Sequence, residues 1–273
     1  MLISAKLAPC FPYEQLERFW RDADALGFYG VWNYDHFYGL VDHTQDTLEG
    51  WTTLAAMAKV VERAKIGCMV TGVTYRNPGL LDNMAVTVDH ISGGRLQFGL
   101  GAAWHEPEHL AYGIDYPAAG TRIAMLDEAL QVITSLWTEE KTTFHGDFFT
   151  VSDALCNPKP VQQPRPWVVV GGNGPRKTLR VVATHADEWN AIGEPDEWMR
   201  LSGILDEHCA AIGRDPASIR RSVQLFIHPA TEGQPAEQLA KLPQYEDAGC
   251  QHAILSFYQP PDKALLESCA PTD

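Results

Sequence analysis

The sequence predicts an α/β fold, a (β/α)8 barrel that forms a single domain over residues 1–273. Strand-like and helix-like segments alternate almost throughout the chain. They make about eight strand–helix units, and a barrel of this kind typically has ~250 residues. A doubly wound parallel sheet shows the same local alternation and is the alternative fold. The number of units favours the barrel.

In the first half of the chain, apolar strands are each followed by a segment with helical periodicity. Asn77-Pro78 is a typical helix start, and apolar residues follow it at helical spacing from Leu80 to Ile91. The expected strands are residues 2–7, 28–33, 64–71 and 95–101. The helices expected after them are residues 13–26, 51–61, 80–91 and 123–137.

The second half continues the alternation. We expect strands at residues 167–170, 188–192, 219–227 and 253–258, and helices at residues 178–186, 198–212 and 236–248. Two inserts interrupt the pattern: residues 104–120 after the fourth strand, and a small hairpin at residues 142–152, with Gly146 at its turn, before the fifth strand. The proline-rich residues 157–166 are an extended connector inside the domain, because the alternation resumes directly after them.

The amino-acid composition argues against some classes of binding partner. The chain has 35 acidic and 21 basic residues and a formal net charge of −14, which repels nucleic acid and anionic membranes. No apolar run approaches the ~20 residues that cross a bilayer, and no segment resembles a secretory signal. Six cysteines without a CxxC spacing are expected to be free thiols. We therefore expect a cytoplasmic protein that binds a small molecule.

Small, polar and ionisable residues gather after the expected strands, where a barrel builds its site. Asp35 and His36 follow the second strand. His36 is the best acid–base candidate, because imidazole exchanges a proton near neutral pH and a carboxylate beside it can fix its orientation. A solvated loop pair is the alternative. Residues that could approach a ligand at other strand ends are Val70, Thr71, Gly101, Ala102 and Trp104.

The glycine-rich segment after the fifth strand is a candidate phosphate cradle. Gly171, Gly172, Asn173 and Gly174 would expose backbone N–H groups, and the next helix would follow at once, with its dipole favouring an anion. Arg176 lies in the expected first turn of that helix. A glycine-rich strand-to-helix turn without a ligand is the alternative interpretation.

Two short motifs resemble known functional patterns, but neither has all the features that its function needs. Gly99-Leu-Gly101 begins like a dinucleotide-binding GxGxxG, but Trp104 occupies the third glycine position. His105-Glu106-Pro107-Glu108-His109 matches the HExxH pattern of zinc hydrolases, which needs both histidines on one face of a helix. Pro107 is tolerated only in a first helical turn, so we expect no metal here. A zinc hydrolase using His105, Glu106 and His109 is a remote alternative.

Several segments together resemble the luciferase-like flavin and deazaflavin oxidoreductases, especially the branch that uses the deazaflavin coenzyme F420. They cover nearly the whole chain. The segments are GFYGVWNYDHF, MVTGVTYRNPGLL, DHISGGRLQFGLGAAWHEPEHLAYG, LDEALQVITSLWTEE, NPKPVQQPRP and VVVGGNGPRKTLRVVATHADEWN.

The resemblance implies a (β/α)8 barrel with the cofactor ring at the carboxyl ends of the strands. It also implies a backbone bulge against the ring at Met69-Val70, often with a cis peptide bond between non-proline residues. Asp35 and His36 match the pair found near the deazaflavin ring in this family, and 171–174 match the turn near its phosphate. Some deazaflavin dehydrogenases carry a catalytic Glu where this chain has Trp104, and Glu106 is the nearest carboxylate.

The resulting expectation is an oxidoreductase that moves a hydride between coenzyme F420 and a small organic substrate. His36 would be the proton partner, held by Asp35, and Trp104 would wall the substrate space. An FMN-dependent luciferase-like monooxygenase is the alternative within the family, and a catalytically silent cofactor-binding barrel is a further alternative. The family also makes a homodimer an expectation.

Overall fold

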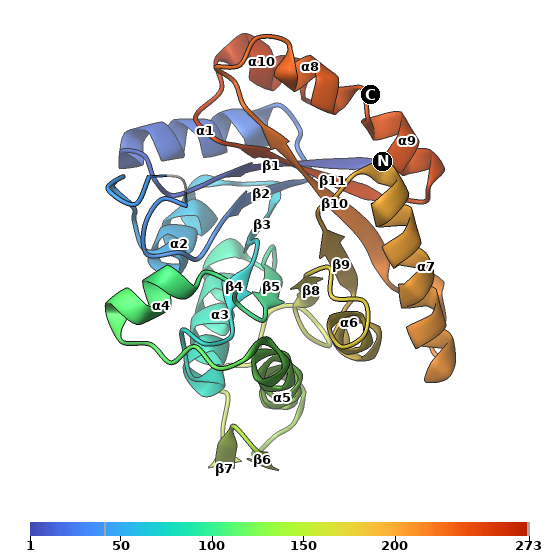
Figure 1. Cartoon of the computed structure of the whole chain (residues 1–273). Coiled ribbons are helices and arrows are strands. Elements are labelled where there is room, and N and C mark those ends of the chain that lie inside the picture. Colours follow the sequence, from blue (N-terminus) through green and yellow to red (C-terminus); the bar gives the residue numbers. More distant parts are fainter. Residues whose placement is uncertain (41, 272–273) are drawn as a thin grey trace.

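The computed structural model describes residues 1–40 and 42–271. Parallel strands form the centre of the molecule and helices surround them (Figure 1). The strands are β1 (Leu2–Leu7), β2 (Gly30–Asn33), β3 (Lys65–Cys68), β4 (Thr71–Gly72), β5 (Gln97–Gly101), β6 (Thr142–His145), β7 (Thr150–Ala154), β8 (Trp167–Gly171), β9 (Glu188–Ala191), β10 (Arg220–Ile227) and β11 (His252–Phe257). The helices are α1 (Tyr13–Ala25), α2 (Gly50–Val60), α3 (Pro78–Ser92), α4 (Glu106–Tyr112), α5 (Ala119–Thr138), α6 (Thr178–His185), α7 (Pro195–Ala211), α8 (Gln234–Leu239), α9 (Leu242–Asp247) and α10 (Lys263–Ser268), with a 3-10 turn at Pro216–Ser218.

The central sheet is all-parallel, nine-stranded and nearly closed into a barrel. Its strand order is β3-β2-β1-β11-β10-β9-β8-β5-β4. An isolated bridge between Ile66 and Leu96 links β3 to β5, so the two ends of this order meet. The doubly wound alternative is therefore wrong, because such a sheet would leave its edge strands apart.

Alternation along the strands divides the side chains between two environments. In β1, Ala5 and Leu7 belong to the large apolar core between the sheet and the helices, whereas Ser4 and Lys6 belong to the barrel interior. A small apolar cluster of Trp32, Met69, Val169 and Ile254 fills the middle of that interior. It separates the amino-terminal ends of the strands from their carboxyl ends, where the chain leaves room for a ligand.

Three predicted elements differ from the observed ones. The strand expected at 64–71 is interrupted between β3 and β4 by the bulge at Met69-Val70. The helix expected from residue 123 begins at Ala119, so Gly120 lies inside α5 rather than in the insert. The helix expected at 236–248 is two short helices, α8 and α9.

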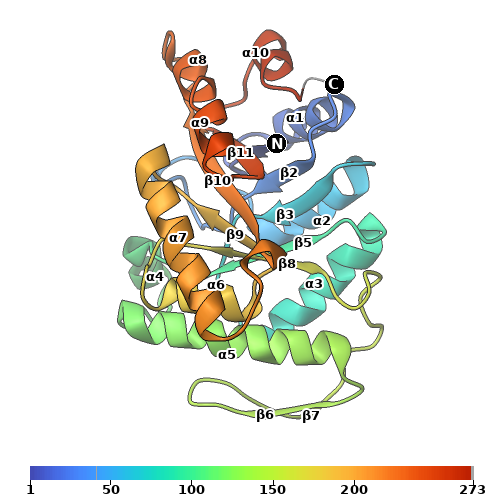
Figure 2. The ribbon, with the colours of Figure 1, turned by 90° about the vertical axis from the view of Figure 1, so that its right-hand side faces the viewer.

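The two inserts have local structure of their own. The first contains α4, and the second forms the antiparallel strands β6 and β7, which lie beneath α5 (Figure 2). All six cysteines are buried and free, as predicted. Among the described residues, no helix is long and apolar enough to cross a membrane. The predicted domain also includes residues 41 and 272–273, which lie outside the described part of the chain.

Candidate active site

A cavity of about 520 Å³ opens at the carboxyl ends of the barrel strands. The structure brings most of the predicted site residues to its wall. Those that line it are Asp35, His36, Met69, Val70, Thr71, Gly101, Ala102, Trp104, Gly171, Gly172 and Asn173. Gly174 and Arg176 are not among its lining residues, and Arg176 is exposed.

One wall of the cavity is a backbone bulge packed against glycines. The Met69-Val70 peptide is cis, as the resemblance implied. The Val70 side chain lies where a Cβ on Gly101 would be only 2.7 Å from its Cγ2 atom, and a Cβ on Gly171 would be 3.1 Å from it. Side chains at these two positions would displace Val70. The glycines at the ends of β5 and β8 thus allow a flat, mostly apolar wall.

His36 is held by a carboxylate that the sequence analysis passed over. Its Nδ1 atom lies 2.6 Å from Oε1 of Glu108, and the backbone N–H of Phe37 donates to Oε2 of the same residue at 2.9 Å. The Tyr75 hydroxyl also donates to Oε1. Nε2 of His36 makes no hydrogen bond to a described residue, so this atom is available to a ligand in the cavity.

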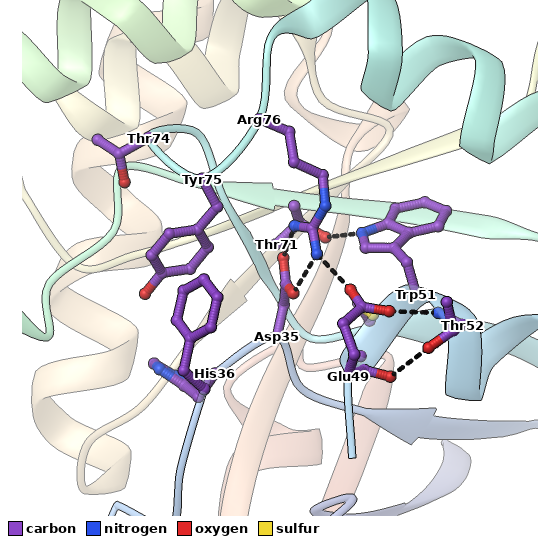
Figure 3. A network of polar contacts seen from close by, with 12 residues as sticks. Asp35, His36, Glu49, Trp51, Thr52, Thr71, Thr74, Tyr75 and Arg76 are labelled. Carbon is purple, nitrogen blue, oxygen red and sulfur yellow. Dashed lines mark hydrogen bonds and ion pairs between the residues drawn. The ribbon is translucent and has the colours of Figure 1, made fainter. Parts of the chain in front are cut away.

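The expectation that Asp35 holds His36 is wrong. Asp35 forms a two-pronged ion pair with Arg76 instead, at 2.6 and 3.0 Å, and Arg76 also pairs with Glu49 (Figure 3). Burial raises the pKa of Asp35 although Arg76 opposes the shift. This cluster joins the loops that follow β2 and β4, so Asp35 shapes the cavity without orienting the imidazole.

Glu108 owes its position to α4, in the first insert. Pro107 is at the start of this helix, where it removes no intrahelical hydrogen bond, and His105 precedes the first turn. Glu108 is fully buried. Burial alone would raise its pKa, but the hydrogen bonds from His36, Tyr75 and Phe37 outweigh burial and lower the pKa to about 2. The carboxylate is therefore charged at neutral pH, beside the imidazole.

The HExxH pattern does not form the zinc site that its spacing suggests. Nδ1 of His109 contacts the carbonyl of His105 at 2.8 Å, and its Nε2 contacts the Thr74 hydroxyl at 2.7 Å. Glu106 is exposed. The side chains that converge are instead those of His36, His105 and Glu108, whose ligand atoms lie within 4.8 Å of one another. This second set could hold a metal ion.

His105 differs from His36 in its hydrogen-bond partners. Its Nδ1 atom is buried and has no hydrogen-bond partner among the described residues. Burial lowers the pKa of His105, and Glu108 only partly opposes this effect. His105 therefore remains a neutral imidazole beside the His36–Glu108 pair.

The glycine-rich turn is more open than predicted. The helix α6 begins at Thr178, as expected, but a turn at residues 175–177 separates it from Gly174, so Arg176 lies before the helix and not in its first turn. Asn173 uses its side chain to accept from the Ile192 N–H at 3.2 Å, which ties this turn to the loop after β9. Among the described residues, nothing accepts from the backbone N–H groups of Asn173 and Gly174. These two donors remain available to an anion.

Among the polar residues of the cavity wall that sequence reasoning missed are Lys6 and Gln224. Each is on a strand and belongs to the inward-facing alternate positions. The signal was present, because a lysine in the mostly apolar segment LISAKL is unusual for a buried strand. Glu108 had a weaker signal, its spacing of three residues from His105 at a helix start.

Comparison with known proteins places the chain in a family. The family model described as luciferase-like monooxygenase matches residues 3–265. An uncharacterized protein of Mycobacterium tuberculosis is 28% identical over 229 residues, which cover 84% of this chain and 75% of that protein. Pyrimidine monooxygenase RutA of Klebsiella pneumoniae is 32% identical over 190 residues, covering 67% of this chain and 51% of RutA. The chain thus spans about half the length of that enzyme.

A solved structure extends the likeness to the whole fold. An F420-dependent secondary alcohol dehydrogenase in complex with an F420-acetone adduct superposes with a TM-score of 0.88, with 17% identity and 99% of each chain covered. At this identity the likeness concerns the fold, and the match of the family model carries the assignment. The chain belongs to the luciferase-like monooxygenase family.

Proposed function

We propose that this protein is an oxidoreductase that transfers a hydride between bound coenzyme F420 and a small organic substrate. The observation that carries the proposal is the pairing of two features in one cavity. The bulge at Met69-Val70 provides a flat wall over Gly101 and Gly171, and His36 borders the same cavity with one ring nitrogen unused. Family membership supports oxidoreductase chemistry at this site.

The residues present fit a deazaflavin or a flavin. The wall is apolar and free of side chains at two strand ends, which suits a planar ring. Asn173 lines the cavity and Gly174 follows it directly, so a phosphate on a cofactor tail could accept from their unused N–H groups. Bound F420 would supply the ring carbon that donates or accepts the hydride. Arg176 would act only on the outer part of such a tail.

His36 would move the proton that accompanies the hydride. Glu108 fixes Nδ1, so Nε2 is the atom that would give or take a proton. The negative charge of Glu108 stabilises the imidazolium form that arises during the reaction. Trp104 is 62% exposed, with its ring centroid 5.8 Å from that of His36. It would cover the substrate at the cavity mouth.

An FMN-dependent monooxygenase on the same barrel is the second candidate, because RutA, a relative in sequence, is a monooxygenase. The test is a titration of the apoprotein with coenzyme F420 and with FMN, followed by fluorescence. We expect tighter binding of F420. Tighter binding of FMN would support the second candidate, and binding of neither would contradict both proposals.

A further inference from the structure

Lys6 is a buried amine in the wall of the cavity. It lies on β1 and is 6% exposed, and among the described residues its Nζ atom donates only to Oε1 of Gln224 on β10, at 2.9 Å. Its Nζ atom is 5.8 Å from the centre of the Tyr34 ring. Among the described residues, no carboxylate lies within ion-pair distance of this amine. A buried lysine without an anionic partner is costly, which calls for a reason.

The unused polar groups of Lys6 and Gln224 are hydrogen-bond donors. An ammonium has three N–H donors, and Gln224 accepts one of them. The amide nitrogen of Gln224 donates to no described residue. Burial lowers the pKa of Lys6 to about 8, which leaves the amine mostly protonated at neutral pH. The nearby thiol of Cys68 stays neutral, since burial raises its pKa well above the usual value.

This donor pair lies across the barrel from β5, whose Gly101 packs against Val70 of the bulge. In the strand order, Lys6 on β1 and Gln224 on β10 flank β11. When β3 and β4 are counted as one position, β11 is equally far from β5 in both directions around the barrel. The cavity therefore has an apolar wall at Gly101 and Gly171 and a donor-bearing wall facing it. A ligand between the walls would need an oxygen on one side.

We infer that Lys6 and Gln224 form a subsite for a carbonyl or carboxylate oxygen of a ligand in this cavity. The inference rests on the proposed function only in taking this cavity as the ligand site. Two sources have this chemistry: a ring carbonyl of the cofactor, and a carbonyl or carboxylate of the substrate. Either oxygen would accept from both side chains. Lys6 is then a binding residue whose charge is kept at the expense of stability.

The substitution Lys6→Met tests this inference, because methionine keeps the length of the side chain and removes its charge and donors. Lys65→Met is the matched control: Lys65 begins β3, at the opposite end of the barrel, and among the described residues its Nζ atom donates only to the Gly94 carbonyl, at 3.4 Å. Gln224→Leu is a second variant that removes the other donor. The thermal midpoint of each variant is measured without ligand.

Two binding titrations separate the sources of the oxygen. In the first, ligand-free protein is titrated with coenzyme F420 and with FMN. In the second, sodium acetate and acetone are titrated into cofactor-loaded protein, and acetate also into ligand-free protein. A charged hydrogen bond of ordinary strength predicts that Lys6→Met weakens one of these affinities by about ten- to a hundredfold. Loss in the first titration identifies the cofactor, and loss in the second the substrate.

A binding role also predicts the stability result. Lys6→Met should keep or raise the thermal midpoint, because a buried charge without an anionic partner is removed. A midpoint that falls well below that of Lys65→Met, with every affinity unchanged in Lys6→Met and Gln224→Leu, would overturn the inference and make Lys6 structural. If native protein binds neither cofactor, the proposed function fails, whereas the acetate titration of ligand-free protein still decides the role of Lys6.

Discussion

Two histidine–glutamate pairs occupy opposite ends of the barrel. His36 and Glu108 are 2.6 Å apart at the carboxyl ends of the strands, and His252 and Glu188 are 2.7 Å apart at the amino-terminal ends. The second pair continues to the Ser4 hydroxyl, 2.7 Å from Nε2 of His252. This is the connectivity of a serine–histidine–carboxylate triad. Judged by this hydrogen-bond connectivity alone, the His252–Glu188 pair would be the better candidate for catalysis.

The two pairs differ, however, in their access to a ligand and in how many hydrogen-bonding atoms remain unused, and both differences favour the His36–Glu108 pair. Ser4, Glu188 and His252 are all fully buried, and both nitrogens of His252 have partners. The Glu188 pKa is pushed up by burial but lowered overall by His252 and Arg220. His36 lines the cavity and keeps one nitrogen without a partner. We therefore expect the His36–Glu108 pair to act in function and the His252–Glu188 pair to stabilise the fold.

The largest expected effect is on turnover after His36→Ala. General acid–base catalysis typically contributes ~10²–10⁴-fold in rate, so turnover with saturating cofactor should fall on that scale. The thermal midpoint should fall only modestly, because the buried Glu108 carboxylate loses His36 but keeps its hydrogen bonds from Tyr75 and Phe37. His43→Ala is the control, since His43 is an exposed histidine of the same loop. Near-normal turnover in His36→Ala would assign the proton transfer to another group.

The opposite outcome is expected for His252→Leu. Removing His252 leaves the buried Glu188 carboxylate with Arg220 as its remaining charged partner, so the unfolding free energy should fall by about 3 kcal/mol, the lower end of the cost of breaking a buried pair. Urea denaturation measures the loss. His145→Leu, at an exposed position of β6, is the matched control and should change stability by no more than ~0.5 kcal/mol. A large loss of turnover in folded His252→Leu protein would show that the two ends of the barrel are functionally coupled.

A smaller effect, with a defined pH dependence, is expected for Glu108→Gln. The folded-state pKa of Glu108 is about 2, below its usual value of 4.5. Its contribution to stability is therefore fully present above pH 4.5 and lost as the pH falls toward 2. The difference in unfolding free energy between native and Glu108→Gln protein should shrink over that interval. Turnover should fall less than in His36→Ala, because Glu108 positions the imidazole.

Asp35→Asn provides the contrast to Glu108→Gln. It should weaken the ion pair with Arg76 and leave the Nδ1 contact of His36 intact. A turnover loss in Asp35→Asn that exceeds the loss in Glu108→Gln would contradict the assignment of Glu108 as the partner of His36.

The barrel and the position of its site could be predicted from the sequence, because they depend on local periodicity and on the ends of strands. His36 and the glycines Gly101 and Gly171 lie where these signals placed them, and the bulge at Met69-Val70 lies where the family resemblance placed it. The partners of His36 could not be predicted in this way. Glu108 is separated from His36 by 72 positions, and Asp35 was preferred because it is adjacent in sequence.

Adjacent residues of an extended segment point to opposite sides, so sequence neighbours are poor hydrogen-bond partners. Asp35 and His36 follow this rule, since one contacts Arg76 and the other Glu108. Lys6 and Gln224 were missed for a related reason: their contact joins two strands, and the two residues are 218 positions apart in the chain. Pairing of distant segments is a property of the closed sheet, and a single sequence carries no local signal for it.

The smallest expected effect concerns metal. The atoms of His36, His105 and Glu108 that could bind a metal lie within 4.8 Å of one another. The His36–Glu108 pair thus has a third possible metal ligand beside it, which the His252–Glu188 pair lacks among the described residues. Glu108, however, already accepts from His36, Tyr75 and Phe37, which leaves little capacity for an ion. Treatment with a chelator should therefore leave turnover and thermal stability unchanged, and elemental analysis should find no stoichiometric zinc. One zinc per chain, lost in His105→Ala but retained in His109→Ala, would instead make this cluster a metal site and His36 a ligand rather than a proton carrier.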